Sequence, residues 1–139
     1  MVSLEEFQKI ARTIVKVNLA IKERDITLIN AGPKSLKFAE ALALEASKVG
    51  AQPAIFYGSD ELALKTYNSI KIKYLKNFPR LADVLSRVAD VEIIIDDTNP
   101  FVARQLPQKK VEIRRKVTKP IRDRKEKREM KKELKTALV

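Results

Sequence analysis

The chain has 139 residues, enough for one domain whose core needs neither disulfides nor a structural metal. It contains no cysteine and no histidine, which excludes disulfides, thiolate chemistry, imidazole bases and histidine metal ligands from this chain. Its net charge of +11 is uneven, because residues 1–103 carry 14 Lys/Arg against 13 Asp/Glu and residues 104–139 carry 15 against 5. The basic character therefore belongs to the last quarter of the sequence.

Hydropathy gives no sign of a membrane segment. No apolar run approaches the roughly 18 to 20 residues that span a bilayer, and the N-terminal residues lack the pattern of a signal peptide. We therefore expect a cytoplasmic protein without membrane contact. The Lys/Glu-rich composition without cysteine also favours a thermophilic source.

The first predicted element is an amphipathic helix. Ser3 and Glu6 have the spacing of a capping box, and apolar residues recur at three- and four-residue steps as far as Ile21. This pattern predicts a helix from Ser3 to about Lys22. A polar turn at 23–25 and a strand over 26–29 follow.

A glycine turn leads from this strand into the second predicted helix. Asn30–Pro33 precedes the helix, Gly50 ends it as a left-handed cap, and Ala51–Tyr57 forms the next strand, which completes a βαβ unit. Backbone N–H groups at such a turn can hold an anion. Because the turn has a single glycine, an ordinary connection is the alternative.

The segment from Leu62 to Val88 keeps a helical pattern. Ser59 is the expected N-cap, and Pro79 interrupts the pattern. We therefore predict two helices divided near Pro79.

The stretch Ala89–Pro100 predicts the central strand and the first candidate site. Three consecutive isoleucines, 93–95, leave no polar face, which suits a parallel sheet covered on both sides. Ligands of such sheets bind beyond the carboxyl ends of the strands. The candidate site residues are therefore Asp96, Asp97 and Asn99, for a small-molecule or nucleotide ligand, and a solvated strand end is the structural alternative.

These elements predict an α/β fold, with a small, mostly parallel sheet covered by helices in a Rossmann-like three-layer arrangement. Residues 1–106 form the expected α/β core. Residues 107–139 form a basic helical extension and the start of a final strand, packed on the same domain. In this extension we expect an exposed helix over 122–135, with Glu126, Glu129 and Glu133 paired to neighbouring cations. The sequence stops just after a strand begins at Thr136, which predicts that the natural polypeptide continues.

The same extension supports a functional alternative, a stand-alone nucleic-acid-binding domain. Clustered Lys and Arg neutralise phosphates and release counterions. Five acidic residues in the segment and the lack of a known binding motif argue against this function. The expected contacts would be Arg114, Arg115, Lys116, Lys119, Arg122, Arg124 and Lys125, continuing to Lys127 and Arg128.

Four phrases of the sequence occur in an order that is typical of a known family; they are LAIKERDITLI, ASKVGAQPAIFY, ADVEIII and the final TALV. Together they resemble the N-terminal region of the aminopeptidase T family of thermophilic metallo-aminopeptidases. Gly50-Ala51 and Ala89-Asp90-Val91 match the family, whereas Lys22–Asp25 departs from its glycine turn. The resemblance covers nearly the whole chain through phrases that belong to the fold and not to catalysis.

This resemblance implies the non-catalytic N-terminal domain of a two-domain exopeptidase that removes N-terminal residues from peptides. The family uses two divalent metal ions, whose Glu, His, Tyr and Asp ligands lie in a C-terminal domain that this sequence lacks. The resemblance therefore implies no catalytic or metal-binding residue in this chain. The implied partners are the missing catalytic domain, a peptide substrate and a second copy in a homodimer.

Overall fold

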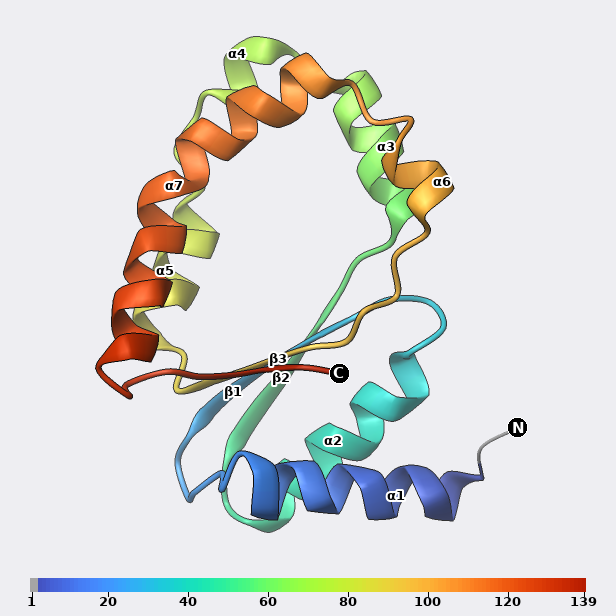
Figure 1. The fold of residues 1–139 in the computed structure, drawn as a ribbon, viewed down its shortest axis with the longest axis vertical. Helices are drawn as coiled ribbons and strands as arrows, with labels where there is room; N and C mark the ends of the chain where they lie inside the picture. The colour runs from blue at the N-terminus through green and yellow to red at the C-terminus, as the bar shows by residue number, and fades with distance from the viewer. Residues whose placement is uncertain (1–2) are drawn as a thin grey trace.

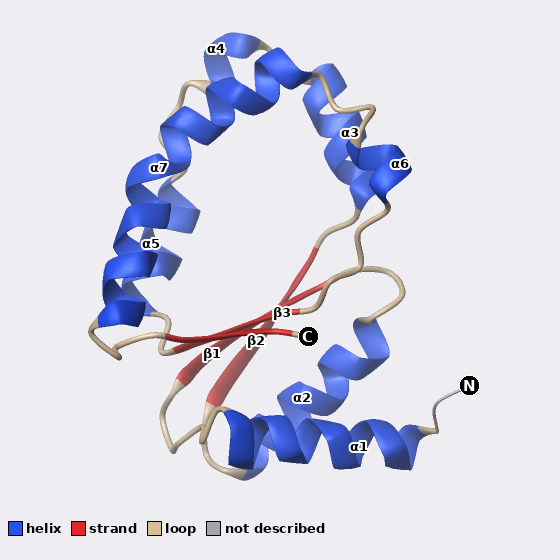
Figure 2. Ribbon diagram, viewed as in Figure 1, coloured by secondary structure: helices blue, strands red, loops and turns tan. Residues whose placement is uncertain are grey.

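A four-stranded parallel sheet organises the computed structural model, which describes residues 3–139. The strand order is β2-β1-β3-β4, with β1 and β3 inside the sheet (Figure 2). The predicted α/β class with a parallel sheet is confirmed. The strands are β1 (Ile26–Ala31), β2 (Gln52–Tyr57), β3 (Val91–Ile94) and β4 (Lys135–Leu138).

The main core lies between one face of the sheet and two N-terminal helical segments (Figure 1). These are α1 (Leu4–Thr13), which continues as the π-helical turn η1 (Ile14–Asn18), and α2 (Leu36–Lys48). Alternate residues of each strand point to this face because the side-chain period of a strand is two. Ile29, Val91 and Ile93 are fully buried here against Val15 and Leu42.

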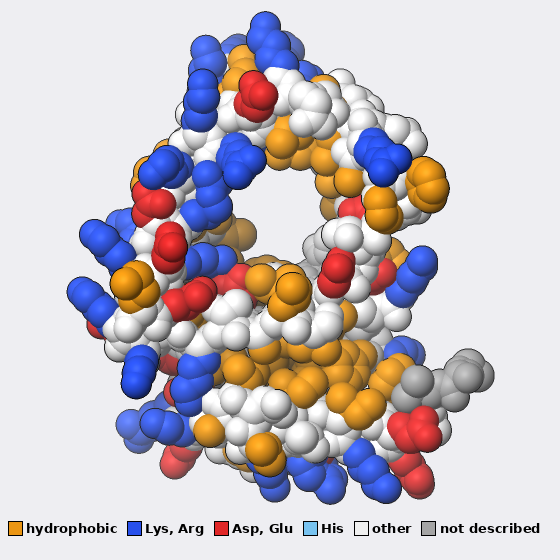
Figure 3. Space-filling view, in the orientation of Figure 1, with side chains coloured by type: hydrophobic (Ala, Val, Ile, Leu, Met, Phe, Trp, Pro, Cys, Tyr) orange, Lys and Arg blue, Asp and Glu red, His pale blue; other side chains and the backbone are white. Residues whose placement is uncertain are grey.

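The other face is covered less completely, by α5 (Arg80–Val88) and the long α7 (Gln108–Met130) (Figure 1). The helices α3 (Asp60–Ser69), α4 (Ile72–Leu75) and α6 (Pro100–Ala103) complete an arch that stands away from the sheet. Pro120 lies inside α7, where the missing N–H and the ring bend a helix. Between this arch and the sheet the space-filling view shows an opening (Figure 3).

The structure corrects the predicted end of the first helix. Its capping box forms as expected, with Glu6 N donating to Ser3 Oγ at 3.2 Å. The helix ends at Asn18 and not near Lys22, because a wide π turn unwinds it: Leu19 N donates to Ile14 O at 2.9 Å. Leu19 and Ile21 remain buried, so the apolar pattern continued past the helix.

The prediction of two helices between Leu62 and Val88 is wrong, because the structure has three. The additional break lies at Ile70 and Lys71, both of which are extended. Lys110 of α7 donates to the carbonyls of Tyr67 and Ile70 at 2.7 and 2.8 Å and thereby satisfies the end of α3. This tertiary contact leaves no signal in the local sequence.

The predicted exposed helix over 122–135 has the wrong bounds. The helix α7 begins fourteen residues earlier, at Gln108, and continues through Pro120 to Met130. Of the predicted glutamate pairs, Glu133 lies 3.7 Å from Arg128, whereas Glu129 accepts a hydrogen bond from Thr136. The final strand forms as predicted and pairs with β3.

Other local expectations are confirmed. Gly50 ends α2 with a φ of 86°, and Ser59 caps α3 by accepting from Leu62 N at 3.0 Å. No helix within residues 3–139 is both long enough and apolar enough to cross a membrane.

Candidate functional site at the carboxyl ends of the strands

The strand order reverses between β1 and β3, and a cavity of about 360 Å³ opens beyond the carboxyl ends of the strands there. In open α/β sheets this point of reversal is the usual ligand site. The apolar floor of the cavity includes Phe56 and Ile95. Its polar side chains are those of Asn30, Tyr57, Ser59, Asp60, Asp97 and Thr98.

The carboxylate of Asp97 occupies the N-terminal end of α2. Its Oδ2 accepts hydrogen bonds from Lys34 N at 2.8 Å, from Ser35 N at 3.1 Å and from Ser35 Oγ at 3.1 Å. Backbone amides at this position hold phosphates in nucleotide-binding folds. The chain thus fills its own anion position with Asp97, and the turn at Asn30–Pro33 is an ordinary connection, not a free anion site.

Gly32 permits this close approach. A Cβ atom at position 32 would lie 2.5 Å from Asp97 Oδ2 and 2.9 Å from Asp97 Cβ. Ser35 Oγ accepts from Gly32 N at 2.9 Å, which closes the turn on its other side. The glycine is required for space between β1 and α2.

The other two predicted site residues do not line the cavity. Asp96 accepts from Thr98 Oγ1 at 2.8 Å and from Thr98 N at 3.1 Å, and these bonds lower the pKa of Asp96. Asn99 caps α6 by accepting from Phe101 N at 3.0 Å, and its own N–H donates to the Asp60 carboxylate. The structure brings Asp97 to the cavity and leaves Asp96 and Asn99 to shape the loop.

The donor set of the described residues does not fit a metal centre. Among residues 3–139 no three acidic side chains are arranged to hold a metal ion. The two carboxylates at the cavity are already engaged, Asp97 by three donors and Asp60 by Asn99 N. Divalent metals bound by proteins need several free oxygen, nitrogen or sulfur ligands together. No metal-dependent step can be assigned to these residues.

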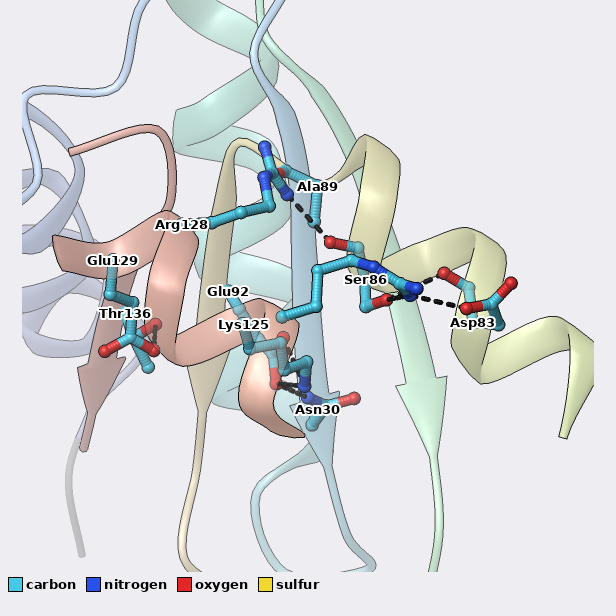
Figure 4. A network of polar contacts seen from close by, with 10 residues as sticks. Asn30, Asp83, Ser86, Ala89, Glu92, Lys125, Arg128, Glu129 and Thr136 are labelled. Atoms are coloured by element: carbon cyan, nitrogen blue, oxygen red, sulfur yellow. Dashed lines mark hydrogen bonds and ion pairs between the residues drawn. The ribbon is translucent and has the colours of Figure 1, made fainter. Parts of the chain in front are cut away.

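A polar network between α5, α7 and the sheet was missed by the sequence analysis (Figure 4). Arg124 donates to Asp83 and to Ser86 Oγ, while Arg128 donates to the carbonyls of Ser86 and Ala89 at 2.9 and 2.7 Å. The Arg124 hydrogen bond lowers the pKa of Asp83. Ser86 is fully buried. This network holds the second half of α7 against α5.

Glu92 forms a second part of the same network. It is a buried residue of β3, and its carboxylate accepts from Lys125 Nζ at 2.9 Å and from Asn30 Nδ2 at 3.4 Å (Figure 4). A buried carboxylate requires a partner of this kind. A charged residue inside an apolar strand is the sequence signal that could have indicated such a partner, but the sequence prediction did not use it, and it does not identify Lys125.

The first seven of the nine residues predicted to contact nucleic acid, from Arg114 to Lys125, lie in different environments. Arg124 and Lys125 are engaged within the fold, and Arg114 turns to the arch, where its Nη1 donates to Asn77 O at 3.3 Å. The remaining four line a surface hollow of about 340 Å³ on α7 together with Glu112; they are Arg115, Lys116, Lys119 and Arg122.

Two of those four cations also have partners on their own helix. Lys119 pairs with Asp123 at 2.8 Å, and Arg122 donates to Thr118 Oγ1 at 2.6 Å. Arg115 and Lys116 form no ion pair within residues 3–139. Their role in nucleic-acid binding stays a prediction.

Comparison with known proteins agrees with this architecture. Wild-type AmpT from Thermus thermophilus is similar in structure, with a TM-score of 0.79 over 96% of this chain at 21% sequence identity. The chain spans only 35% of the length of that protein. The search of curated proteins finds no match. The family model described as thermophilic metalloprotease (M29) matches residues 3–139, so the chain belongs to this family, as its resemblance to aminopeptidase T predicted.

Proposed function

We propose that the chain is the N-terminal, non-catalytic domain of a divalent-metal-dependent aminopeptidase that removes N-terminal residues from peptides. One observation carries the proposal: the family match extends over residues 3–139, yet the chain spans 35% of AmpT and its described residues offer no metal-ligand group. The metal ions and the reacting groups then belong to the rest of a longer polypeptide.

The domain's role in that enzyme is to shape and shield the substrate cavity and to support assembly. The surface of α5 supports this proposal, because its polar side is turned inward against α7 and its apolar side faces out. Leu81, Val84 and Val88 are 68%, 53% and 42% exposed and lie along one side of the helix. An apolar surface of this kind is typical of protein contacts.

The test begins with the chain alone. The 139-residue protein is incubated with leucine p-nitroanilide and with a tripeptide, with and without Zn²⁺, Co²⁺ or Mg²⁺. We expect no hydrolysis above the metal-only control. Hydrolysis that copurifies with the chain and disappears with a chelator would disprove the non-catalytic assignment.

The second step uses the natural protein. Antibodies against this chain precipitate it from its own cell extract, and its intact mass and aminopeptidase activity are measured before and after chelation. We expect a mass more than twice 15.8 kDa and activity that the chelator removes. A mass near 15.8 kDa without activity would contradict the proposal.

A nucleic-acid-binding domain is the second candidate, favoured by the four cations that share one side of α7. Its test is the binding of a labelled 20-mer DNA and RNA at 20 and 200 mM salt. When a protein contacts n phosphates, the logarithm of its binding constant falls linearly with the logarithm of the salt concentration, with a slope of about −0.7n to −0.9n. If Arg115→Gln with Lys116→Gln leaves this slope unchanged, or if nothing binds at 20 mM, this candidate fails.

A further inference from the structure

The arch contains a second cavity, of about 490 Å³, between α3, α4 and the first half of α7. Its wall is mainly apolar and aromatic, and it includes Leu62, Tyr74 and Phe78, which are 53%, 49% and 47% exposed. Pockets for small ligands have volumes of about 300 to 1,000 Å³ and combine such walls with a few polar groups. This cavity therefore has the size and composition of a binding pocket.

Among the described residues that line this cavity, Arg114 has the one charged side chain. Its Nη1 donates to Asn77 O at 3.3 Å, but within residues 3–139 it forms no ion pair. Arg124 and Arg128 on the same helix both have carboxylate partners. The guanidinium of Arg114 thus brings an unbalanced positive charge to an apolar pocket.

Two further polar side chains lie beside the apolar wall. Thr66 and Asn77 line the cavity, and in the described part of the chain neither side chain forms a hydrogen bond with another residue. They provide a hydroxyl and an amide for a ligand that has polar groups next to an apolar one. Figure 3 shows hydrophobic side chains on one wall of the opening and Lys and Arg side chains on the facing wall.

We propose that this pocket binds the C-terminal residue of a peptide that ends in a large apolar side chain. The side chain enters between α3 and α4, and the terminal carboxylate pairs with the guanidinium of Arg114, a geometry that allows two parallel hydrogen bonds. Asn77 and Thr66 bind the preceding peptide group. The choice of a peptide over another apolar carboxylate rests on the proposed function. The evidence for the pocket and for its positive charge is independent of that function.

The experiment titrates the 139-residue chain with N-acetyl-leucyl-phenylalanine and with the same dipeptide as its C-terminal amide, followed by NMR chemical shifts. We expect the acid to bind at least about tenfold more tightly than the amide, since a charge-assisted hydrogen bond is worth about that factor. Arg114→Gln should abolish the difference. Arg115→Gln, the neighbouring residue on the outer side of α7, removes the same charge and should preserve it.

A second variant tests the apolar part of the pocket. Ala63 lines the cavity, so Ala63→Phe should fill it and weaken the binding of acid and amide alike, with circular dichroism and the melting temperature confirming that the variant folds. Equal binding of acid and amide, or acid binding that Arg114→Gln leaves intact, overturns the proposal.

Octanoate is an apolar carboxylate without a peptide group, so its binding tests whether the pocket recognises a peptide. If octanoate binds as tightly as the dipeptide acid, with the same dependence on Arg114, the assignment to a peptide is overturned. None of these titrations measures hydrolysis. The precipitation assay tests the aminopeptidase proposal, so a failure of that proposal can be distinguished from a failure of ligand binding in these titrations.

Discussion

Single residues at the strand ends serve structure more than chemistry, and Asp97 is the main example. Its carboxylate satisfies two backbone amides at the start of α2 and the Ser35 hydroxyl. We expect Asp97→Ala to lower the free energy of unfolding by about 1 to 3 kcal/mol, because buried or capping donors lose their acceptor. Urea unfolding at pH 7 measures this.

Asp96→Ala is the matched control for that measurement. The side chain of Asp96 is exposed and, within residues 3–139, forms hydrogen bonds only with Thr98 in its own loop. We expect its loss to change stability by less than about 0.5 kcal/mol, the usual range for surface substitutions. Equal losses in the two variants would contradict the structural role of Asp97.

The two glycines at the cavity also differ in a way that can be measured. Gly32→Ala places a Cβ 2.5 Å from Asp97 Oδ2, whereas a Cβ at Gly58 would meet nothing within 4 Å. Overpacking of this kind costs about 1 to 3 kcal/mol, and the open site should tolerate alanine. If both variants shift the melting temperature by the same amount, Gly32 does not pack closely against Asp97.

At the scale of elements, the polar network between α5 and α7 predicts that the stability of the fold depends on pH. The hydrogen bond from Arg124 lowers the pKa of Asp83 in the folded chain below its unfolded value. Asp83 therefore stabilises the fold fully above its unfolded pKa of about 4. This contribution is lost as the pH falls through the lower, folded pKa. Asp83→Asn should thus be less stable than the wild type at pH 7, and the difference should shrink toward pH 3.

The control variant for this polar network is Asp123→Asn. The pKa of Asp123 is also lowered, chiefly by the hydrogen bond from Lys119, but that pair is exposed on α7. Water and salt screen exposed pairs, so its effect at pH 7 should be smaller than that of Asp83. A difference for Asp83→Asn that stays constant from pH 7 to pH 3 would refute the assigned ion pair.

At the scale of the whole molecule, the last strand joins the first helical segment to the sheet. Lys135 of β4 donates to the carbonyls of Leu19 and Ala20 at 2.8 and 3.3 Å, just beyond the end of η1. Lys135→Met keeps the aliphatic stem but removes both hydrogen bonds, and we expect a loss of about 1 to 3 kcal/mol. Lys131→Met, at an exposed position, is the control. Similar melting temperatures for the two variants would show that this connection contributes nothing.

The amino-acid sequence was sufficient to predict the elements that depend on neighbouring residues. The capping box at Ser3, the left-handed cap at Gly50 and the strand around Ile93 follow from local chemistry, which acts in the same way in any fold. The parallel sheet followed from the alternation of strands and helices. The family followed from short phrases of sequence, such as Ala89-Asp90-Val91, without knowledge of the fold.

The places where polar groups meet depend instead on how the chain folds. The break between α3 and α4 depends on Lys110, the pairing of Glu92 depends on Lys125, and the filling of the anion position depends on Asp97, 62 or 63 residues from the amides that it binds. Such contacts join residues that are distant in sequence, so no local pattern specifies them. For the same reason the pocket beside Arg114 could not be predicted from the sequence, because its walls come from separate helices that only the folded arch brings together.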